Sequence, residues 1–323
     1  MAEKLVLIDT DAGTDDAWGL FMALAAHRDL NPPLFRIVGI TTSCGNTMVD
    51  NVANNVTRVL DTVQDTTTPI YKGMDGFMLS DFRFLEDPPY HGEDGFGDAN
   101  LPPIPTRVQA EHSIQAIIRL AEMYQGQLTM VCFGPLTNLA MAVKMQPQIK
   151  NWFKEIYVLG GNIQGVGNVV GVSSSAEFNF FVDPEAAQVV LDSFEGTPIY
   201  DLPWEIMLET KSTHDFRTQN LGNMGTPTMA LMNAIEAKNL GEVTDYWLAP
   251  DPILIACVID PTIMLELEDQ RCDVELTGEL TRGMMVLDRN PNSAKPKNVK
   301  VIMSVNLSRY EAMLIWAAGG PRP

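Results

Sequence analysis

The sequence is poor in cysteine and in basic residues, and each shortage excludes a class of protein. Its four cysteines are widely separated, and none forms a CxxC pair or a Cys/His cluster with metal-ligand spacing. This excludes a zinc finger and favours reduced thiols. Only 22 lysines and arginines stand against 41 acidic residues, which gives a net charge of −19. Nucleic acids and anionic membranes bind basic surfaces, so we expect neither as a partner.

Long apolar runs are also missing. No uncharged stretch is long enough to span a bilayer, and the first residues, MAEKLVLIDTD, lack the basic and apolar regions of a signal peptide. We therefore expect a cytoplasmic protein. The chain has 323 residues, 46% of them hydrophobic, and shows no internal repeat and no obvious interdomain linker. These properties predict one globular domain over residues 1–323.

Short aliphatic runs alternate with longer helical patterns along the chain. We expect strands at residues 4–9, 36–42, 68–73, 128–134, 155–161 and 197–203. We expect helices at residues 15–27, 49–61, 109–124, 136–145, 183–194 and 306–318. Continuous apolar strands that alternate with helices indicate parallel pairing through right-handed crossovers. The predicted fold is α/β, with one open, mostly parallel, doubly wound (Rossmann-like) sheet, helices on both faces, and a small C-terminal β-hairpin plus a further strand within residues 271–305.

One long segment, residues 74–106, is rich in glycine, proline and aspartate. A connection of this length inside a compact domain is usually functional, so we expect a binding loop or a lid.

Four aspartates, Asp9, Asp11, Asp15 and Asp16, lie within eight positions, where the first strand is predicted to end. Ligands of open α/β sheets bind beyond such strand ends. Two unit charges about 4 Å apart repel by roughly 4 kcal/mol at an effective dielectric constant near 20. The dipole at a helix N-terminus stabilises each acidic residue by only about 0.3–1 kcal/mol. A helix cap could explain Asp15 or Asp16 alone, but not Asp11 as well.

Such a cluster requires either protonated carboxyl groups or a bound cation. Oxygen ligands without nearby histidine or cysteine favour Ca²⁺ or Mg²⁺ over zinc. Ca²⁺ takes six to eight oxygens, so we expect further ligands from distant segments. An EF-hand is excluded because no alternating acidic loop with a closing glutamate follows. The D-x-D pattern of haloacid-dehalogenase-type phosphatases is approached, with Asp9 as nucleophile, but Thr14 lies one residue late.

Eight segments, taken in order, resemble the motifs of the inosine–uridine preferring nucleoside hydrolases. They are DTDAGTDDA (9–17), ITTSCGN (40–46), HGEDGFGD (91–98), GPLTNLAMA (134–142), VLGGN (158–162), SAEFNFFVDPEAA (175–187), APDPILIACVIDP (249–261) and RGMMVLD (282–288). A single short motif could arise by chance, but eight in family order are not expected to. The resemblance implies a calcium-dependent enzyme that hydrolyses the N-glycosidic bond of ribonucleosides, working as a homodimer or homotetramer.

The resemblance also implies roles for individual residues. The calcium ligands would be the carboxylates of Asp11, Asp16 and Asp251 and the backbone carbonyl of Thr137. Asp11 would also be the general base for a water on the metal, with Asn46 beside that water and Asp9 orienting a neighbour. The ribose hydroxyls would be held by Asp15, Asn168, Glu177 and Asn179.

The half of the site that would hold the base departs from the family pattern. Members of one branch carry a histidine, which protonates the leaving base, where this chain has Pro250. A second, purine-preferring branch lacks this histidine and has a tryptophan immediately before the aspartate, where the nearest aromatic residues here are Tyr246 and Trp247. A stacked ring could make a purine basic enough for solvent to protonate it. Alternatively, His91, His214 or Tyr246 could supply the proton. Trp204 and Glu205 stand where an aliphatic residue and an aspartate are expected. Two other functions therefore stay open at this point: a Mg²⁺-dependent haloacid-dehalogenase-like phosphatase, and a ribose- or metal-binding protein without turnover.

Overall fold

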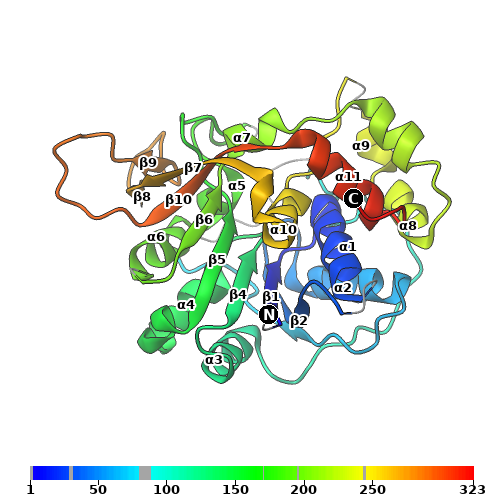
Figure 1. Cartoon of the computed structure of the whole chain (residues 1–323), viewed down its shortest axis with the longest axis horizontal. Coiled ribbons are helices and arrows are strands. Elements are labelled where there is room, and N and C mark those ends of the chain that lie inside the picture. Colours follow the sequence, from blue (N-terminus) through cyan, green and yellow to red (C-terminus); the bar gives the residue numbers. More distant parts are fainter. Residues whose placement is uncertain (1–2, 29–31, 80–88, 170, 195, 243–244) are drawn as a thin grey trace.

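The computed structural model describes residues 3–28, 32–79, 89–169, 171–194, 196–242 and 245–323. Its centre is an eight-stranded sheet in the order β3-β2-β1-β4-β5-β6-β10-β7 (Figure 1). The strands are β1 (Leu5–Thr10), β2 (Arg36–Thr42), β3 (Ile70–Lys72), β4 (Leu128–Cys132), β5 (Phe153–Leu159), β6 (Ile199–Leu202), β7 (Met264–Gln270) and β10 (Val299–Val305). All neighbours pair in parallel except β10 and β7. The predicted single-domain, mostly parallel α/β fold is confirmed.

Helices cover both faces of the sheet (Figure 1). On one face α3 (Ser113–Met123), α4 (Thr137–Met145) and α6 (Pro184–Ser193) pack side by side. On the other lie α1 (Thr14–Arg28), α2 (Val49–Thr62), α10 (Asp251–Ile259) and α11 (Leu307–Ala317). Because successive crossovers lead in opposite directions from the centre, the sheet is doubly wound.

The shorter elements complete the chain. They are α5 (Phe178–Val182), α7 (Trp204–Glu209), α8 (Pro227–Ile235), α9 (Ala237–Glu242), the 3₁₀ turns η1 (Pro147–Asn151) and η3 (Pro261–Ile263), and the π-helix η2 (Phe216–Leu221). A separate antiparallel hairpin pairs β8 (Cys272–Val274) with β9 (Met285–Leu287) and projects at one end of the molecule (Figure 1). This is the predicted C-terminal hairpin.

Local sequence explains most of these elements. Every residue of β1 is buried, as expected for the centre of a sheet covered on both faces. In α2 the buried valines Val49, Val52, Val56 and Val59 recur at helical spacing. The α6 helix starts as predicted, because the Asp183 side chain accepts a hydrogen bond from the Ala186 backbone N–H and Pro184 occupies the first position.

Several elements were not predicted. Strand β7 pairs antiparallel at the edge of the sheet, and its sequence MLELEDQ is largely exposed and charged, so it carries no signal of a buried strand. The short helices α5, α7, α8, α9 and η2 were also missed, because none is long enough to show a clear helical period. The α10 helix was missed as well, because its sequence DPILIACVI is apolar almost throughout and shows no helical period.

The strand order fixes where a ligand can bind. β1 and β4 are neighbours at the centre, and the chain moves outward from them in opposite directions, through β2 and through β5. The carboxyl ends of β1 and β4 therefore flank the switch point, where open α/β sheets have their binding crevice. Among the described residues, no helix is both long and apolar enough to cross a membrane.

Candidate active site

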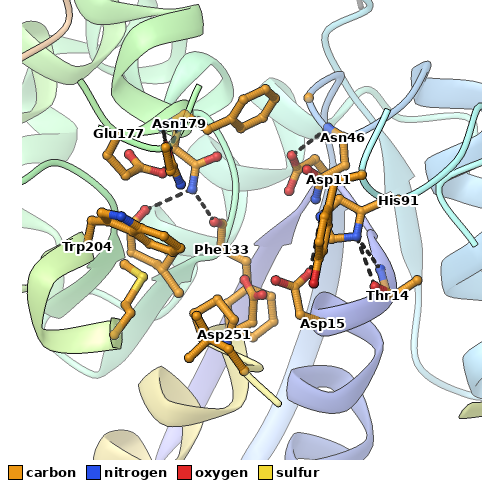
Figure 2. A pocket seen from close by; sticks show the side chains of 18 of the residues that line it. Asp11, Thr14, Asp15, Asn46, His91, Phe133, Glu177, Asn179, Trp204 and Asp251 are labelled. Atoms are coloured by element: carbon orange, nitrogen blue, oxygen red, sulfur yellow. Dashed lines mark hydrogen bonds and ion pairs between the residues drawn. The ribbon is translucent and has the colours of Figure 1, made fainter. Parts of the chain in front are cut away.

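A cavity of about 460 Å³ opens at this switch point. Side chains that follow β1, β2, β4 and β5 meet there with the first residue of α10 (Figure 2). The predicted site residues that line it are Asp11, Asp15, Asn46, Asn168, Glu177, Asn179 and Asp251. The predicted residues Asp16 and Thr137 are buried but are not among the residues that line it. The structure thus brings most of the predicted site together.

Three carboxylates gather at one side of the cavity, two of them, Asp15 and Asp251, in its lining and Asp16 buried behind them. Asp15, Asp16 and Asp251 each present an oxygen within 4.8 Å of the others. Asp15 and Asp16 lie in the first turn of α1, and Asp251 opens α10, which packs against α1. Burial, followed by the charge of Asp15, raises the pKa of Asp251 well above its ordinary value. Burial and the charge of Asp15 raise the pKa of Asp16 to about 6.

Asp11 lies in a tight backbone cradle. A Cβ atom added to Gly45 would fall 2.0 Å from its Oδ2, and one added to Gly134 would fall 2.5 Å from its Oδ1. The backbone N–H of Asn46 donates to Oδ2 at 2.8 Å. Burial, and then the charge of Asp16, raises the pKa of Asp11 well above its ordinary value. Two glycines and one amide therefore hold this carboxyl group at the end of β1.

Asp16 is held from three directions. Thr10 Oγ1 donates to Oδ1 at 2.5 Å, and the backbone N–H of Gly13 donates to Oδ2 at 2.9 Å. The Asn46 side chain also donates to Oδ2, at 3.1 Å. Because Asn46 bonds both Asp11 and Asp16, it fixes the spacing of the two carboxyl groups.

Asp9 and Thr137 lie outside the cavity. Asp9 is fully buried and accepts hydrogen bonds from Thr41 Oγ1 and Asn138 Nδ2. It is not among the residues that line the cavity, so a ligand there would not touch it. Burial raises its pKa to about 7. The phosphatase hypothesis, which makes Asp9 the nucleophile, is therefore not supported. Thr137 is the first residue of α4, and its hydroxyl donates to Asp183 at 2.6 Å.

Glu177 and Asn179 stand across the cavity from Asp11 and His91 (Figure 2). Glu177 caps α5 and accepts hydrogen bonds from three backbone amides, those of Gly161, Asn179 and Phe180. Burial raises its pKa to about 7. Asn179 Nδ2 donates to the carbonyls of Phe133 (2.7 Å) and Leu159 (3.0 Å), so its Oδ1 is the atom left to meet a ligand.

Asn168 is fixed through its other amide atom. Its Oδ1 accepts from the Phe178 backbone N–H at 2.7 Å, which leaves Nδ2 as the donor for a ligand. Asn179 thus offers an acceptor and Asn168 offers a donor, and hydroxyl groups can bind both.

Two further residues singled out in the sequence lie at the cavity. His91, a candidate proton donor in the segment 91–98, lines it; its Nδ1 accepts from the Thr14 backbone N–H at 3.1 Å, and its Nε2 lies 3.7 Å from Asp15. Trp204, where the chain departs from the family pattern, also lines it. Sequence reasoning missed Glu236, which lines the cavity and is marked by no local pattern. The segment predicted to be a lid contributes Phe77, Pro89, Tyr90 and His91, while residues 80–88 lie outside the described part.

The donor set fits a hard divalent cation. None of the described residues that line the cavity is a lysine or an arginine, so no lysine or arginine in its wall balances Asp11, Asp15 and Asp251. The raised pKa values of Asp11, Asp16 and Asp251 are the expected result of burying like charges without a counterion. Carboxylate oxygens are the ligands that Ca²⁺ and Mg²⁺ prefer.

Comparison with known proteins agrees with this geometry. The sequence model described as inosine-uridine preferring nucleoside hydrolase matches residues 6–312. An inosine-uridine preferring nucleoside hydrolase of Leishmania major is 32% identical over 94% of this chain and 93% of its own. A pyrimidine-specific ribonucleoside hydrolase of a Shewanella strain is 30% identical over 96% and 94%.

A solved structure of a related enzyme has the same fold. The purine-preferring ribonucleoside hydrolase of Gardnerella vaginalis superposes with a TM-score of 0.82 at 26% identity, covering 98% of each chain. The match of the sequence model extends over almost the whole chain. This chain belongs to the inosine-uridine preferring nucleoside hydrolase family.

Proposed function

We propose that the protein hydrolyses ribonucleosides to ribose and free base with calcium as its cofactor and Asp11 as general base. As a member of its family, it is a hydrolase that acts on ribonucleosides. The proposal of a calcium cofactor and a general base rests on the buried carboxylate cluster. In this cluster Asp251 lies beside the acidic residues of segment 11–16, although more than two hundred residues separate them in the sequence.

The proposed calcium ligands are Asp11, Asp16, Asp251 and the backbone carbonyl of Thr137. In the structure, Asp15 is grouped with Asp16 and Asp251, while Asp11 interacts electrostatically with all three. Asp16 and Asp251 are common to both sets, so they form the centre of the proposed site. When bound, calcium would stabilise the ionised carboxylates, orient hydroxyl groups and make a water molecule more acidic.

Asp11 is suited to take a proton from that water. The Asn46 amide engages only Oδ2, and Gly134 leaves room beside Oδ1 because it has no side chain. The Asn46 side chain keeps Asp16 at a fixed distance from this group. With water bound beside Oδ1, Asp11 would be a carboxylate within the hydrogen-bond reach that a general base requires.

The ribose would lie between Asp15 on one side and Asn168, Glu177 and Asn179 on the other. The free Oδ1 of Asn179 can accept from a hydroxyl, and the free Nδ2 of Asn168 can donate to one. Cleavage of the bond to the base leaves positive charge on the sugar ring, and the surrounding acidic groups stabilise that charge.

Position in the structure reduces the number of residues that could protonate the leaving base. Pro250 lines the cavity but carries no proton. His214 Nε2 lies 3.1 Å from the carbonyl of Leu240, and the residue is not among those that line the cavity. His91 and Tyr246 do line it, so these two stay as the protein groups that could serve.

The proposal is tested by measuring ribose release from inosine and uridine with and without a chelator. We expect release that stops on chelation, returns with added Ca²⁺, and falls by at least a hundredfold in Asp11→Asn. Undiminished release after chelation would refute the metal requirement. Near-wild-type release by Asp11→Asn would refute the general base. Ribose binding without any turnover would instead support the non-catalytic alternative.

A further inference from the structure

The cavity has a polar half and an apolar half. The acidic and amide groups described above form the first. The second is built by Trp204, Met207 and Leu208 of α7 and by residues 246–248. Ser212 lies just after α7, and its backbone exchanges hydrogen bonds of 3.0 and 2.9 Å with the backbone of Trp247. These bonds hold the end of α7 beside residues 246–248. A ribonucleoside is divided in the same way, into a hydroxyl-rich sugar and a flat aromatic base.

One acidic side chain, Glu236, anchors the apolar half. It lines the cavity and is 5% exposed. Its Oε1 accepts from the indole N–H of Trp247 at 2.8 Å, and its Oε2 accepts from the indole N–H of Trp18 at 3.1 Å. The indole rings of the two tryptophans meet edge to face, with centroids 5.5 Å apart. Glu236 thus holds both rings through their only polar atoms.

Arg217 supplies the opposite charge. It is fully buried, and its Nε donates to Glu236 Oε2 at 2.9 Å while its Nη2 lies 2.8 Å from the same oxygen. Its guanidinium also lies over the Trp18 ring, 5.5 Å from the centroid, and its Nη1 donates to Asn233. Arg217 belongs to the π-helix η2, a type of segment that is rare and is often found at functional sites.

The positions of Trp18, Arg217 and Trp247 all depend on Glu236. Removing one partner of a buried ion pair leaves the other charged and unpaired, which is strongly unfavourable. Trp247 would at the same time lose the hydrogen bond of its indole N–H to Glu236, and a buried indole N–H without a partner is also unfavourable. The position of the Trp247 ring at the cavity is therefore determined by Glu236 and, through it, by Arg217.

We propose that Glu236, paired with Arg217, is a positioning residue that fixes the Trp247 ring as a wall for the nucleobase and so sets recognition of the base but not of the ribose. This rests on the proposed function. The ribose-facing groups Asp15, Glu177 and Asn179 have their own backbone and side-chain partners, none of which is Glu236, Arg217 or Trp247. The two halves of the cavity can therefore be perturbed separately.

The test compares Glu236→Gln with Glu242→Gln, which removes the same charge from an exposed position six residues further on. The assay measures KM for inosine and for uridine, and the inhibition constant of free ribose, with calcium present. We expect Glu236→Gln to raise KM for the nucleosides about tenfold, since a hydrogen bond to a charged group is lost. The inhibition constant of ribose should stay within about twofold, and Glu242→Gln should match the wild type.

Trp247→Phe is the second variant, and it tests the proposal even if Glu236→Gln fails to fold. It keeps an aromatic ring but removes the indole N–H that bonds to Glu236. It should raise KM in the same direction without changing inhibition by ribose. Unchanged KM in either folded variant would overturn the proposal, and so would a parallel loss of ribose binding, which indicates general damage. A wild type that fails to cleave any ribonucleoside would refute the proposed function itself, so the two failures are distinguishable.

Discussion

The sharpest test of the Asp11 assignment leaves Asp11 itself unchanged. Replacing Gly45 with alanine places a methyl group 2.0 Å from Oδ2, 2.7 Å from Cγ and 2.8 Å from Cβ of Asp11. Carbon and oxygen atoms in ordinary contact are about 3.5 Å apart. The carboxyl group must therefore move by roughly 1 Å or more, and it must give up the 2.8 Å hydrogen bond from the Asn46 amide.

This displacement has a predictable effect on the rate. A misplacement of about 1 Å in a catalytic group costs about a hundredfold in rate, which corresponds to roughly 2.7 kcal/mol in the activation free energy. We expect kcat of Gly45→Ala to fall by about that factor. Gly134→Ala should act in the same way, because its methyl group would lie 2.5 Å from Oδ1 on the opposite side of the carboxyl group.

The assay is ribose release at saturating nucleoside and saturating Ca²⁺, so that weaker binding of either does not reduce the measured kcat. Gly241→Ala is the matched control, because its Cβ would meet no described atom within 4 Å beyond its own stretch of α9. It should retain wild-type activity. If Gly45→Ala is correctly folded and keeps kcat within about threefold of the wild type, the reaction does not depend on the position of Asp11 and our reasoning is refuted.

Two further predictions concern buried acids beside the site. Asp201 lies on β6, fully buried, with neither carboxyl oxygen hydrogen-bonded among the described residues, and burial followed by nearby acidic charges raises its pKa well above the ordinary 3.8. The fold therefore favours the protonated acid, and the stability that this gives is lost as pH rises through the folded-state pKa. Asp201→Asn should raise Tm at about pH 8 and by less at about pH 5; an equal or absent gain would contradict this. Glu205 accepts from the backbone amides of Ile163, Gln164 and Val166 at 2.7–3.2 Å. Glu205→Gln should lower Tm by several degrees and raise KM for nucleosides, because the segment leading to Asn168 loosens; thermal melts and steady-state kinetics check both, and unchanged values would show that this clamp is dispensable.

The sequence by itself determined the architecture of the sheet up to β6, the hairpin and the last helix. These elements were predictable because burial leaves a local record: continuous apolar strands such as β1, valines at helical spacing in α2, and the Asp183 cap of α6. Motifs at the expected strand ends also located most of the cavity. Strand β7 and the helices between β6 and α10 left no such record, since they are short, exposed or charged.

Only the tertiary structure decided which groups meet. It brought Asp251 to Asp16 by packing α10 against α1, and it placed Asp16 and Thr137, both expected as metal ligands, outside the residues that line the cavity. It also brought Trp18 of α1 to Arg217, Glu236 and Trp247, which all lie within residues 217–247. The physical reason is that local sequence fixes which face of a strand or helix is buried, whereas a contact between distant side chains depends on how those elements pack.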